Sequence, residues 1–223
     1  MKYYSIAIDG PAGAGKSTIA KKIARELGYI YIDTGAMYRA MGLYFSDNSI
    51  SLEDETVIAK ACQNVAISIT FADGEQQVIL NGVNVNGRIR TEEAGKMASM
   101  VSAKTAVREK LVELQQELAK TENVVMDGRD IGTKVLVDAD LKVYLTASSL
   151  VRAKRRYEEL VAKGTECNLS DIEKDIIDRD YRDMNRDISP LVQAKDAILV
   201  DSSDMTIDEV KDKIIELFQN AIK

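Results

Sequence analysis

Near its N-terminus the chain reads IDGPAGAGKST, residues 8–18. From Gly10 to Ser17 this stretch fits G-x-x-x-x-G-K-[ST], the pattern of a phosphate-binding loop. The run Tyr3–Ile8 before it is β-branched and aromatic, which predicts a buried strand, and Thr18–Leu27 after it carries apolar residues at helical spacing. The glycines therefore turn a strand into a helix, and the backbone N–H groups at the start of that helix favour a bound anion.

Two side chains of this loop have expected roles of their own. In this motif the lysine, Lys16, reaches the β- and γ-phosphates of a nucleotide, and the hydroxyl of Ser17 ligates Mg²⁺. The residues that we expect to line the polyphosphate are Gly10, Pro11, Ala12, Gly13, Ala14, Gly15, Lys16, Ser17 and Thr18.

The composition narrows the classes of function. The chain has 223 residues and a net charge of −6 without a basic tract, which argues against non-specific binding of nucleic acid. It has no apolar run of about 18 residues and no signal-peptide pattern, so we expect no membrane anchor. Cys62 and Cys167 are far apart and indicate free thiols in a reducing cytoplasm rather than a zinc site. Histidine is absent, which leaves carboxylates, arginines and a metal to carry any chemistry.

The rest of the sequence alternates between strands and helices. Short apolar runs predict strands at residues 3–8, 29–32, 123–126, 141–145 and 197–200. Helical spacing predicts helices at residues 16–27, 36–45, 53–61, 91–103, 105–120, 149–162, 170–188 and 206–222. This order predicts an α/β fold with a five-stranded, mostly parallel sheet flanked by helices. Ligands of such sheets bind beyond the carboxyl ends of the strands, where we expect Asp9, Asp33 and Asp127 to converge.

One interruption of this alternation is rich in β-formers. Residues 65–71, 76–81 and 83–86 are short runs of this kind. They are separated by Ala72-Asp73-Gly74-Glu75 and by Asn81-Gly82, which are hairpin signals. The sequence therefore predicts a small antiparallel sheet inserted into the fold.

A second interruption is the charged stretch 152–168. Lys163-Gly164-Thr165 breaks its helix, and Ser170-Asp171-Ile172-Glu173 has the pattern of a capping box that begins the next one. A mobile helical lid between two helices is expected here. Such a lid could exclude water and surround a transferring phosphoryl group with cations, although a solvated helix face is the alternative. The candidate lid cations are Arg152, Arg155 and Arg156.

Polar side chains follow the second predicted strand in the sequence DTGAMYR, residues 33–39. Thr34 is suited to cap the helix that follows, and its hydroxyl could also face a ligand. Arg39 lies about one turn into that helix, from which it could reach back over the crevice. Taken alone, Arg39 could equally be a solvated helix arginine.

The third predicted strand is followed by DGRD, residues 127–130. An aspartate at a strand end opposite a phosphate loop commonly holds Mg²⁺ or its waters, so we expect Asp127 and Ser17 to form the metal site. Arg129 would offer a planar fork to a phosphate group. A polar turn without a ligand is the alternative interpretation.

Further along, residues 179–187 read RDYRDMNRD, an alternation of charge that is typical of an exposed, salt-bridged helix face. Arg179, Asp183 and Arg186 nevertheless lie at i, i+4 and i+7, which is one face of a helix. Such a face could clamp a phosphate between guanidinium groups while the carboxylate accepts a hydrogen bond from a sugar hydroxyl.

Together, the phosphate loop, DTGAMYR, the β insertion, DGRDIGT and RDYRDMNRDISPL resemble the bacterial cytidylate kinase family from Ile6 to about Asp201. The resemblance implies Mg²⁺-dependent transfer of the γ-phosphoryl group of ATP to CMP or dCMP, in the cytoplasm. It implies small-molecule substrates, no nucleic-acid or membrane partner, and a chemistry for which a monomer suffices. It also implies one domain in three parts, with a core of about residues 1–33, 104–151 and 170–223, a nucleotide-binding insertion of about 34–103 and a lid of about 152–169.

The family's functional residues can be carried over by motif position. The expected catalytic set is Lys16, Arg129, Arg186 and Asp127. Arg39, Arg129 and Arg186 resemble the clamp on the CMP phosphate, and Ser99, Arg108 and Asp130 resemble the residues that read cytosine. Arg179 and Asp183 resemble the pentose contacts, and Thr34 stands where the family often has serine.

Asp130 gives this expectation a physical basis. A carboxylate accepts a hydrogen bond from the exocyclic amine of cytosine, whereas uracil carries a carbonyl oxygen at that position. A site built around the cytosine donor should therefore reject uracil, because two acceptors would face each other without a proton.

Three further functions remain as alternatives. One is another small-molecule kinase on the same core, acting on adenylate, uridylate or a hydroxyl compound such as shikimate, against which the β insertion and the Asp130 and Arg108 pair argue. The second is an ATPase or nucleotide-dependent switch that moves a partner and transfers nothing. The third is a non-catalytic protein that binds nucleotide without turnover. The N-K-x-D motif of GTPases and the L-S-G-G-Q motif of transporter ATPases are both absent from this sequence.

Overall fold

The structure is a computed structural model that describes residues 2–72 and 75–223. By their contacts, these residues form two compact units. One comprises the chain up to Tyr31 together with Glu122–Lys223, and the other comprises Ile32–Thr121. Asp73 and Gly74, at the predicted hairpin turn, lie outside the described residues. The three-part division into core, insertion and lid stays a prediction.

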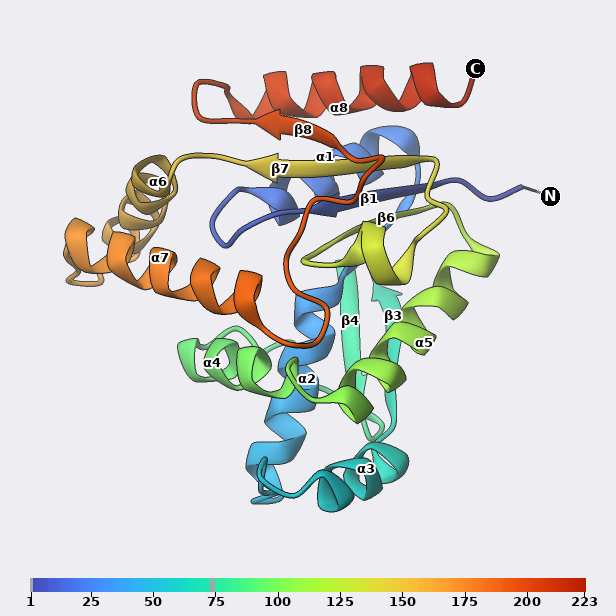
Figure 1. Ribbon diagram of the computed structural model, residues 1–223, viewed down its shortest axis with the longest axis vertical. Coiled ribbons are helices and arrows are strands. Elements are labelled where there is room, and N and C mark those ends of the chain that lie inside the picture. The colour runs from blue at the N-terminus through green and yellow to red at the C-terminus, as the bar shows by residue number, and fades with distance from the viewer. Residues whose placement is uncertain (1, 73–74) are drawn as a thin grey trace. The chain divides into compact units, whose positions relative to one another are not determined.

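A five-stranded sheet in the order β2-β6-β1-β7-β8 is the frame of the first unit (Figure 1). β1 pairs in parallel with both β6 and β7, and β7 pairs in parallel with β8. This confirms the mostly parallel sheet that the alternation of elements predicts. The strands are β1 (Ser5–Asp9), β2 (Ile30–Asp33), β6 (Val124–Gly128), β7 (Leu141–Thr146) and β8 (Ile198–Asp201). β2 leads into the second unit.

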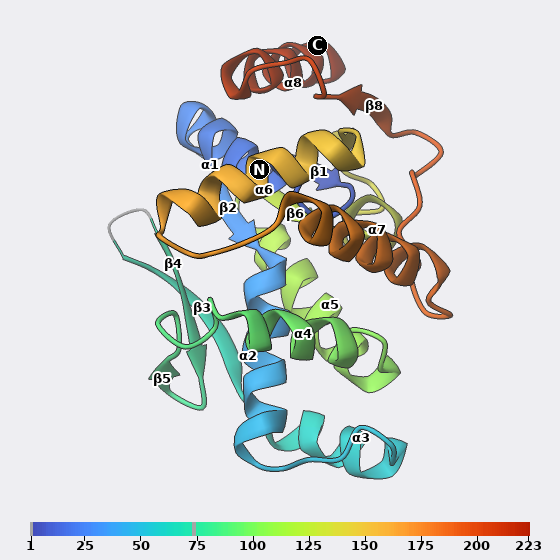
Figure 2. The same ribbon diagram turned by 90° about the vertical axis from the view of Figure 1, so that its left-hand side faces the viewer.

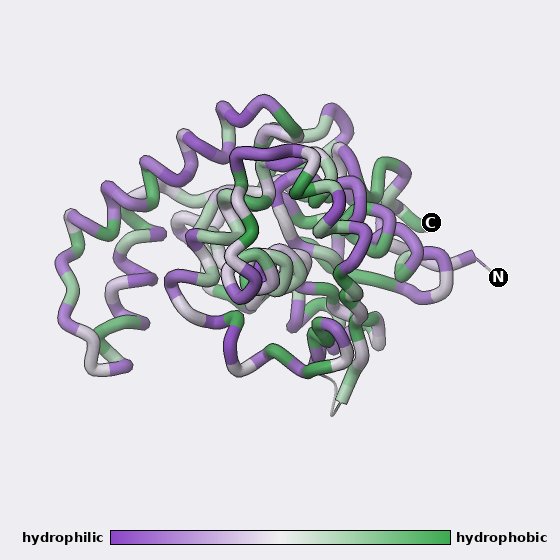
Figure 3. The backbone as a smooth tube through the Cα atoms, turned by 90° about the horizontal axis from the view of Figure 1, so that it is seen from below, coloured by the Kyte–Doolittle hydropathy of each residue, from purple (hydrophilic) through white to green (hydrophobic). Residues whose placement is uncertain are grey.

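Two helices of this unit, α1 (Lys16–Leu27) and α8 (Ile207–Ala221), pack on each other and on the sheet (Figure 1). Ile8, Ile23 and Phe218 are fully or almost fully buried in the core that these elements share. Burial of each such side chain stabilises the fold by about 1.5–3 kcal/mol. Purple and green alternate along the helices in Figure 3, as expected for helices with one buried face.

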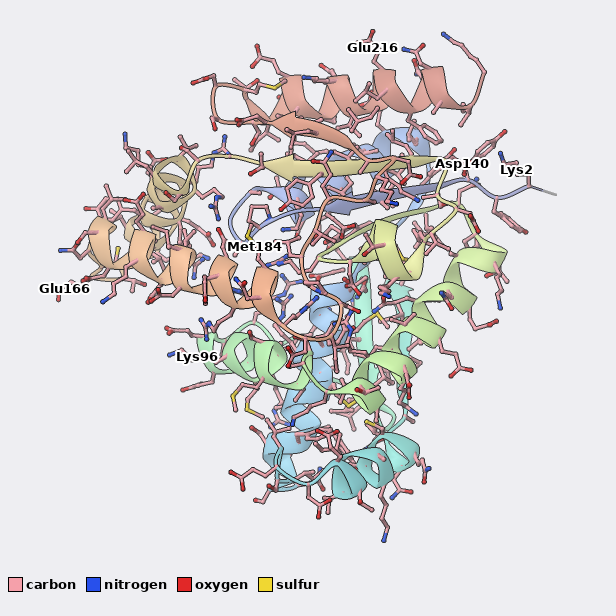
Figure 4. The ribbon with its side chains drawn as sticks, in the orientation of Figure 1. Lys2, Lys96, Asp140, Glu166, Met184 and Glu216 are labelled. Carbon is pink, nitrogen blue, oxygen red and sulfur yellow. The ribbon has the colours of Figure 1, made fainter. Side chains whose placement is uncertain are left out.

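Two further helices, α6 (Ser149–Ala162) and α7 (Leu169–Asn185), pack against each other, and a single turn of π-helix, η1 (Ile131–Val135), follows β6. At the start of β1, Asp140 forms an ion pair with Lys2 at 2.8 Å and accepts a hydrogen bond from the N–H of Ser5 at 2.9 Å (Figure 4). No helix in the described part of the chain is both long and apolar enough to cross a bilayer.

The second unit contains the predicted antiparallel sheet, in the order β3-β4-β5. Figure 2 shows α4 lying across α2, and Gly42 of α2 permits this close approach because a Cβ there would lie 2.9 Å from the Cβ of Met97. The elements are α2 (Thr34–Asp47), α3 (Glu55–Asn64), β3 (Ile67–Ala72), β4 (Glu75–Leu80), β5 (Val83–Asn84), α4 (Glu92–Val101) and α5 (Thr105–Thr121).

The predicted helix caps are wrong at two places. Asp33, not Thr34, caps α2: the helix begins at Thr34 itself, and the carboxylate of Asp33 accepts from the N–H of Ala36 at 2.8 Å. Asn168, not Ser170, caps α7 by accepting from the N–H of Ser170, which leaves no capping box there. The capping box lies instead at the start of α8, between Thr206 and Glu209.

The end of α7 also differs from the prediction. The helix ends at Asn185, and Arg186 is its extended C-cap residue. The chain turns back here, since the N–H of Leu191 donates to the carbonyl oxygen of Asp183 at 2.8 Å. Arg179 and Asp183 therefore lie on α7 as predicted, whereas Arg186 lies in the turn that follows the helix.

Candidate active site

The glycine-rich loop joins β1 to α1 as the sequence predicts. Gly10 runs so close to β7 that a Cβ on it would lie 1.9 Å from the carbonyl oxygen of Leu145. Gly13 and Gly15 have φ values of 76° and 83°, in the left-handed region that L residues with side chains rarely adopt. Gly15 is the N-cap residue of α1 and has no side chain to occupy its first turn. The N–H groups of this turn are thus left for an anion.

Lys16 lies inside the curve of the loop. Its Nζ donates a hydrogen bond to the carbonyl oxygen of Pro11 at 2.7 Å, and the residue is buried. Burial, followed by the nearby charge of Arg129, lowers the pKa of Lys16 to about 7, while Asp127 and Asp9 act in the opposite direction. An anion in the loop would restore the positive charge of this lysine.

Asp127 joins the end of β6 to the first turn of α1. Its Oδ2 accepts from the hydroxyl of Ser17 at 2.8 Å, and its Oδ1 accepts from the hydroxyl of Tyr31 at 2.7 Å. A carboxylate and a hydroxyl side by side are the oxygen donors that Mg²⁺ takes in nucleotide sites. The donor set therefore fits the metal predicted from the sequence. Tyr31 is a member of this group that no sequence motif indicated.

Asp9, which was expected to face a ligand at the strand ends, bonds to the backbone instead. Its two carboxylate oxygens accept from the N–H groups of Ile131 at 2.8 Å and Gly132 at 2.7 Å, at the start of η1. Burial raises the pKa of Asp9 to about 6, against the lowering effect of these two hydrogen bonds. Asp9 thus ties the phosphate loop to the turn after β6, and it does not present a carboxylate to a ligand.

Charged residues of the predicted clamp meet in the first unit. The Nε of Arg129 donates to Oδ2 of Asp183 at 2.8 Å. An Nη of Arg186 lies 4.0 Å from Oδ1 of Asp130, and the Nε of Arg186 donates to the carbonyl oxygen of Ser189. Burial alone would raise the pKa of Asp183, but Arg129, Arg179 and Arg186 hold that pKa below its usual value. The three guanidinium groups that act on Asp183 thus concentrate positive charge here, which is suited to an anion.

The other sequence-predicted residues of the CMP site belong to the second unit. Arg39 pairs with Asp33 at 3.2 Å, and within the described residues its buried Nε has no hydrogen-bond partner. Arg108 is buried, donates to the carbonyl oxygen of Ser102 at 3.1 Å and lies over the ring of Tyr38. Thr34 is buried at the start of α2, and Ser99 is half-buried on α4.

The three predicted lid arginines differ in their surroundings. Arg152 is buried, and it donates to the carbonyl oxygens of Ala147 and Ala12 and pairs with Asp180. Arg155 donates to the backbone and hydroxyl oxygens of Ser202. Arg156 pairs with Glu159, and about half of each of these two side chains is exposed. The role of Asp180 was missed, because it lies within a charged run that predicts a solvated face.

Comparison with known proteins identifies the family of this chain. The family model described as "Cytidylate kinase" matches residues 6–220. The chain is 53% identical to the cytidylate kinase of Lactobacillus johnsonii over 218 residues, which cover 98% of this chain and 95% of that one. It is 51% identical to the cytidylate kinase of Caldicellulosiruptor bescii over 223 residues, which cover 100% of this chain and 99% of that one.

One solved structure, an uncharacterized protein from Eubacterium ventriosum, aligns with a TM-score of 0.56 and 13% identity, covering 98% of this chain and 99% of that one. At this identity the likeness concerns the fold alone. The match of the family model, the identity to two curated relatives over nearly full length and the phosphate loop all agree: the chain belongs to the cytidylate kinase family.

Proposed function

We propose that this protein transfers the γ-phosphoryl group of ATP to CMP or dCMP, with Mg²⁺, and so forms ADP with CDP or dCDP. The observation that carries the proposal is the phosphate loop beside the Ser17–Asp127 pair, in a chain of the cytidylate kinase family. The backbone of residues 10–18 would cradle the phosphates of ATP, with Lys16 at its centre.

Ser17 and Asp127 would hold the metal ion. Their oxygens are 2.8 Å apart, and Tyr31 fixes the second oxygen of the carboxylate. When bound, Mg²⁺ neutralises charge on the β- and γ-phosphates and orients them for in-line displacement. The protein's part is to present these two oxygens from a strand end and a helix start that pack together.

The chemistry needs no strong general base. The attacking group is an oxygen of the CMP phosphate, which is already an anion, and this agrees with a chain that lacks histidine. Lys16, Arg129 and Arg186 would stabilise the charge that develops on the transferring phosphoryl group. Arg129 and Arg186 are already oriented by Asp183 and by the carbonyl oxygen of Ser189, so little reorganisation is needed during the reaction.

The residues proposed to bind the acceptor are those that the sequence motifs indicate. We propose that Arg39, Arg129 and Arg186 bind its phosphate and that Arg179 and Asp183 bind the pentose. Asp183 is suited to accept from a sugar hydroxyl because its low pKa keeps it ionised. For cytosine, the proposed readers are Ser99, Arg108 and Asp130. Thr34 would face the same ligand.

We further propose that the enzyme acts in the cytoplasm as a monomer on these small molecules, without a nucleic-acid or membrane partner. The net charge of −6 without a basic tract supports the first of these exclusions. Closure of the stretch 152–169 would exclude water from the phosphoryl group. Of the three predicted lid arginines, Arg152 is buried and Arg155 is half-buried, whereas Arg156 is exposed and pairs with Glu159; we propose that Arg156 contacts the γ-phosphate.

The test is ADP production from Mg·ATP with CMP, dCMP, UMP, AMP or no acceptor, in the wild type and in Asp130→Asn. We expect rapid turnover with CMP and dCMP only. In Asp130→Asn the preference for CMP over UMP should fall by about tenfold or more, since the amide can offer a donor to the uracil carbonyl. ADP production that does not depend on the acceptor would instead indicate an ATPase.

A further inference from the structure

The peptide groups on both sides of Ala12 are held by side chains from three elements. Before Ala12, the carbonyl oxygen of Pro11 accepts from Lys16 at 2.7 Å, and the N–H of Ala12 donates to Oδ1 of Asp180 at 3.3 Å. After Ala12, its carbonyl oxygen accepts from an Nη of Arg152 at 2.8 Å. Arg152 comes from α6 and Asp180 from α7, and these two helices pack side by side.

Arg152 and Asp180 also form an ion pair with each other. Oδ2 of Asp180 lies 2.7 Å from an Nη of Arg152, whose Nε donates to the carbonyl oxygen of Ala147 at 2.9 Å. Both side chains are largely buried: 7% of the Arg152 side chain and 12% of the Asp180 side chain are exposed. An ion pair this well buried stabilises little by itself, but its geometry is fixed because each charge is costly to leave unpaired.

The bond to Ala12 determines where the loop's own donors point. In a trans peptide the C=O and N–H groups point in opposite directions. When Arg152 holds the carbonyl oxygen of Ala12 outward, the N–H of Gly13 must point to the other side, into the concave face of the loop. Gly13 also packs directly on Arg152, since a Cβ at Gly13 would lie 3.4 Å from the Cβ of Arg152.

Lys16 contributes both to the loop and to the proposed ligand site. Its Nζ bonds to Pro11 in this structure, and it is also the group proposed to reach the β- and γ-phosphates. Asp180 and Arg152 bond to the N–H and the carbonyl oxygen of Ala12 itself, so their hold on the loop does not depend on where the Lys16 side chain points.

We propose that Arg152 and Asp180 are positioning residues that hold the phosphate loop in its binding conformation through both peptide groups of Ala12. This inference rests on the proposed function for its ligand, ATP. It gives Arg152 a different role from that of a mobile lid cation, because its three partners, Ala147, Ala12 and Asp180, all lie outside the predicted lid of residues 152–169.

The experiment measures the dissociation constant of Mg·ATP in the absence of acceptor, then KM for ATP and for CMP, in Asp180→Asn, Arg152→Lys and Arg152→Met. The matched control is Asp196→Asn. It removes the charge that pairs with buried Lys142 at 2.7 Å in the same unit. Urea unfolding of every variant reports its stability.

We expect Asp180→Asn and Arg152→Met to weaken Mg·ATP binding by about tenfold or more, because a loop displaced by a fraction of an ångström loses several backbone donors together. KM for CMP should stay within about threefold. Arg152→Lys should not restore binding, since one ammonium cannot serve Ala12, Ala147 and Asp180 in place of a planar fork. Asp196→Asn should leave the dissociation constant of Mg·ATP and KM for CMP within about twofold of the wild-type values.

Three outcomes would overturn the inference. One is Mg·ATP affinity unchanged in both Asp180→Asn and Arg152→Met. Another is a loss of Mg·ATP affinity in Arg152→Met but not in Asp180→Asn, which would mean that Arg152 contacts the nucleotide directly. The third is a loss in the Asp196→Asn control as large as that in the test variants at equal stability. Failure of the proposed function is separate, since it would leave a wild-type protein that binds Mg·ATP and forms no CDP.

Discussion

The hydroxyl of Ser17 donates a 2.8 Å hydrogen bond to Oδ2 of Asp127, and this bond connects the first turn of α1 to the carboxyl end of β6. The two residues are far apart in the sequence and meet because β1 and β6 are parallel neighbours, with Ile8 in register with Asp127. The phosphate loop that follows β1 therefore lies beside the last residues of β6. This is the arrangement that makes the metal site an expected property of the fold.

For this pair we predict a change in the requirement for Mg²⁺. Asp127→Asn removes the charged ligand, so the Mg²⁺ concentration at half-maximal activity should rise by about tenfold or more, and kcat should fall. Tyr31→Phe is the matched control, because it removes a single hydrogen bond to the same carboxylate. Its effect should be several-fold smaller. Titration of activity with Mg²⁺ checks both, and equal Mg²⁺ dependence in Asp127→Asn and the wild type would be evidence against the site.

The lowered pKa of Lys16 predicts that nucleotide binding takes up a proton. With a pKa of about 7, Lys16 is largely neutral above that pH in the protein without nucleotide, and the phosphates of ATP favour its charged form. Calorimetry of Mg·ATP binding at about pH 8, in buffers of different ionisation enthalpy, should report an uptake approaching one proton. In Lys16→Arg the uptake should vanish, since arginine stays charged. Uptake that persists in this variant would assign the proton to another group.

Asp9 predicts a specific dependence of stability on pH. Its pKa is about 6 in the folded protein against 3.8 for an ordinary aspartate, so folding favours the protonated form. Its contribution is therefore largest at low pH and is lost as the pH rises through about 6. From about pH 7 to about pH 5, the free energy of unfolding of the wild type should gain about 1 kcal/mol relative to Asp9→Asn. Urea unfolding at both pH values measures it, and parallel pH profiles would show that Asp9 does not titrate in this range.

Two glycines of the second unit predict opposite effects of the same substitution. Gly42→Ala would place a Cβ 2.9 Å from the Cβ and 3.1 Å from the backbone carbon of Met97, so we expect a destabilisation of about 1–3 kcal/mol. Gly95→Ala, on α4, meets no atom within 4 Å and should stabilise the helix by about 0.5–1 kcal/mol. Thermal unfolding of the two variants checks this, and a stabilised Gly42→Ala would mean that α2 and α4 separate easily.

Local patterns predicted the parts of this fold that depend on local chemistry. The sequence places the start of α1 at Lys16, where the structure has it, because a glycine loop followed by apolar residues at helical spacing has few other solutions. The antiparallel insertion was predicted for the same reason, from its turn residues. The helix caps were wrong because Asp33, Thr34, Asn168 and Ser170 are all good caps, and the choice between neighbours depends on the path of the chain.

The parts that could not be predicted depend on partners distant in the sequence. Arg152 donates to a carbonyl oxygen 140 positions away, and Asp9 accepts from an N–H 122 positions away. Each looks, from its neighbours alone, like an ordinary helix cation or a strand-end carboxylate. Their burial, and with it their roles and the shifted pKa of Asp9, follows from which strands and helices pack together.

Transfer of a phosphoryl group from ATP to CMP is the reaction on which the proposed roles of these residues depend. The most direct test supplies ATP labelled in its γ-phosphate together with CMP and Mg²⁺, and then separates the nucleotides. We predict that the label is recovered in CDP in step with the appearance of ADP, and that the transfer is lost in Lys16→Ala. Label released as inorganic phosphate at the same rate with and without CMP would contradict the account.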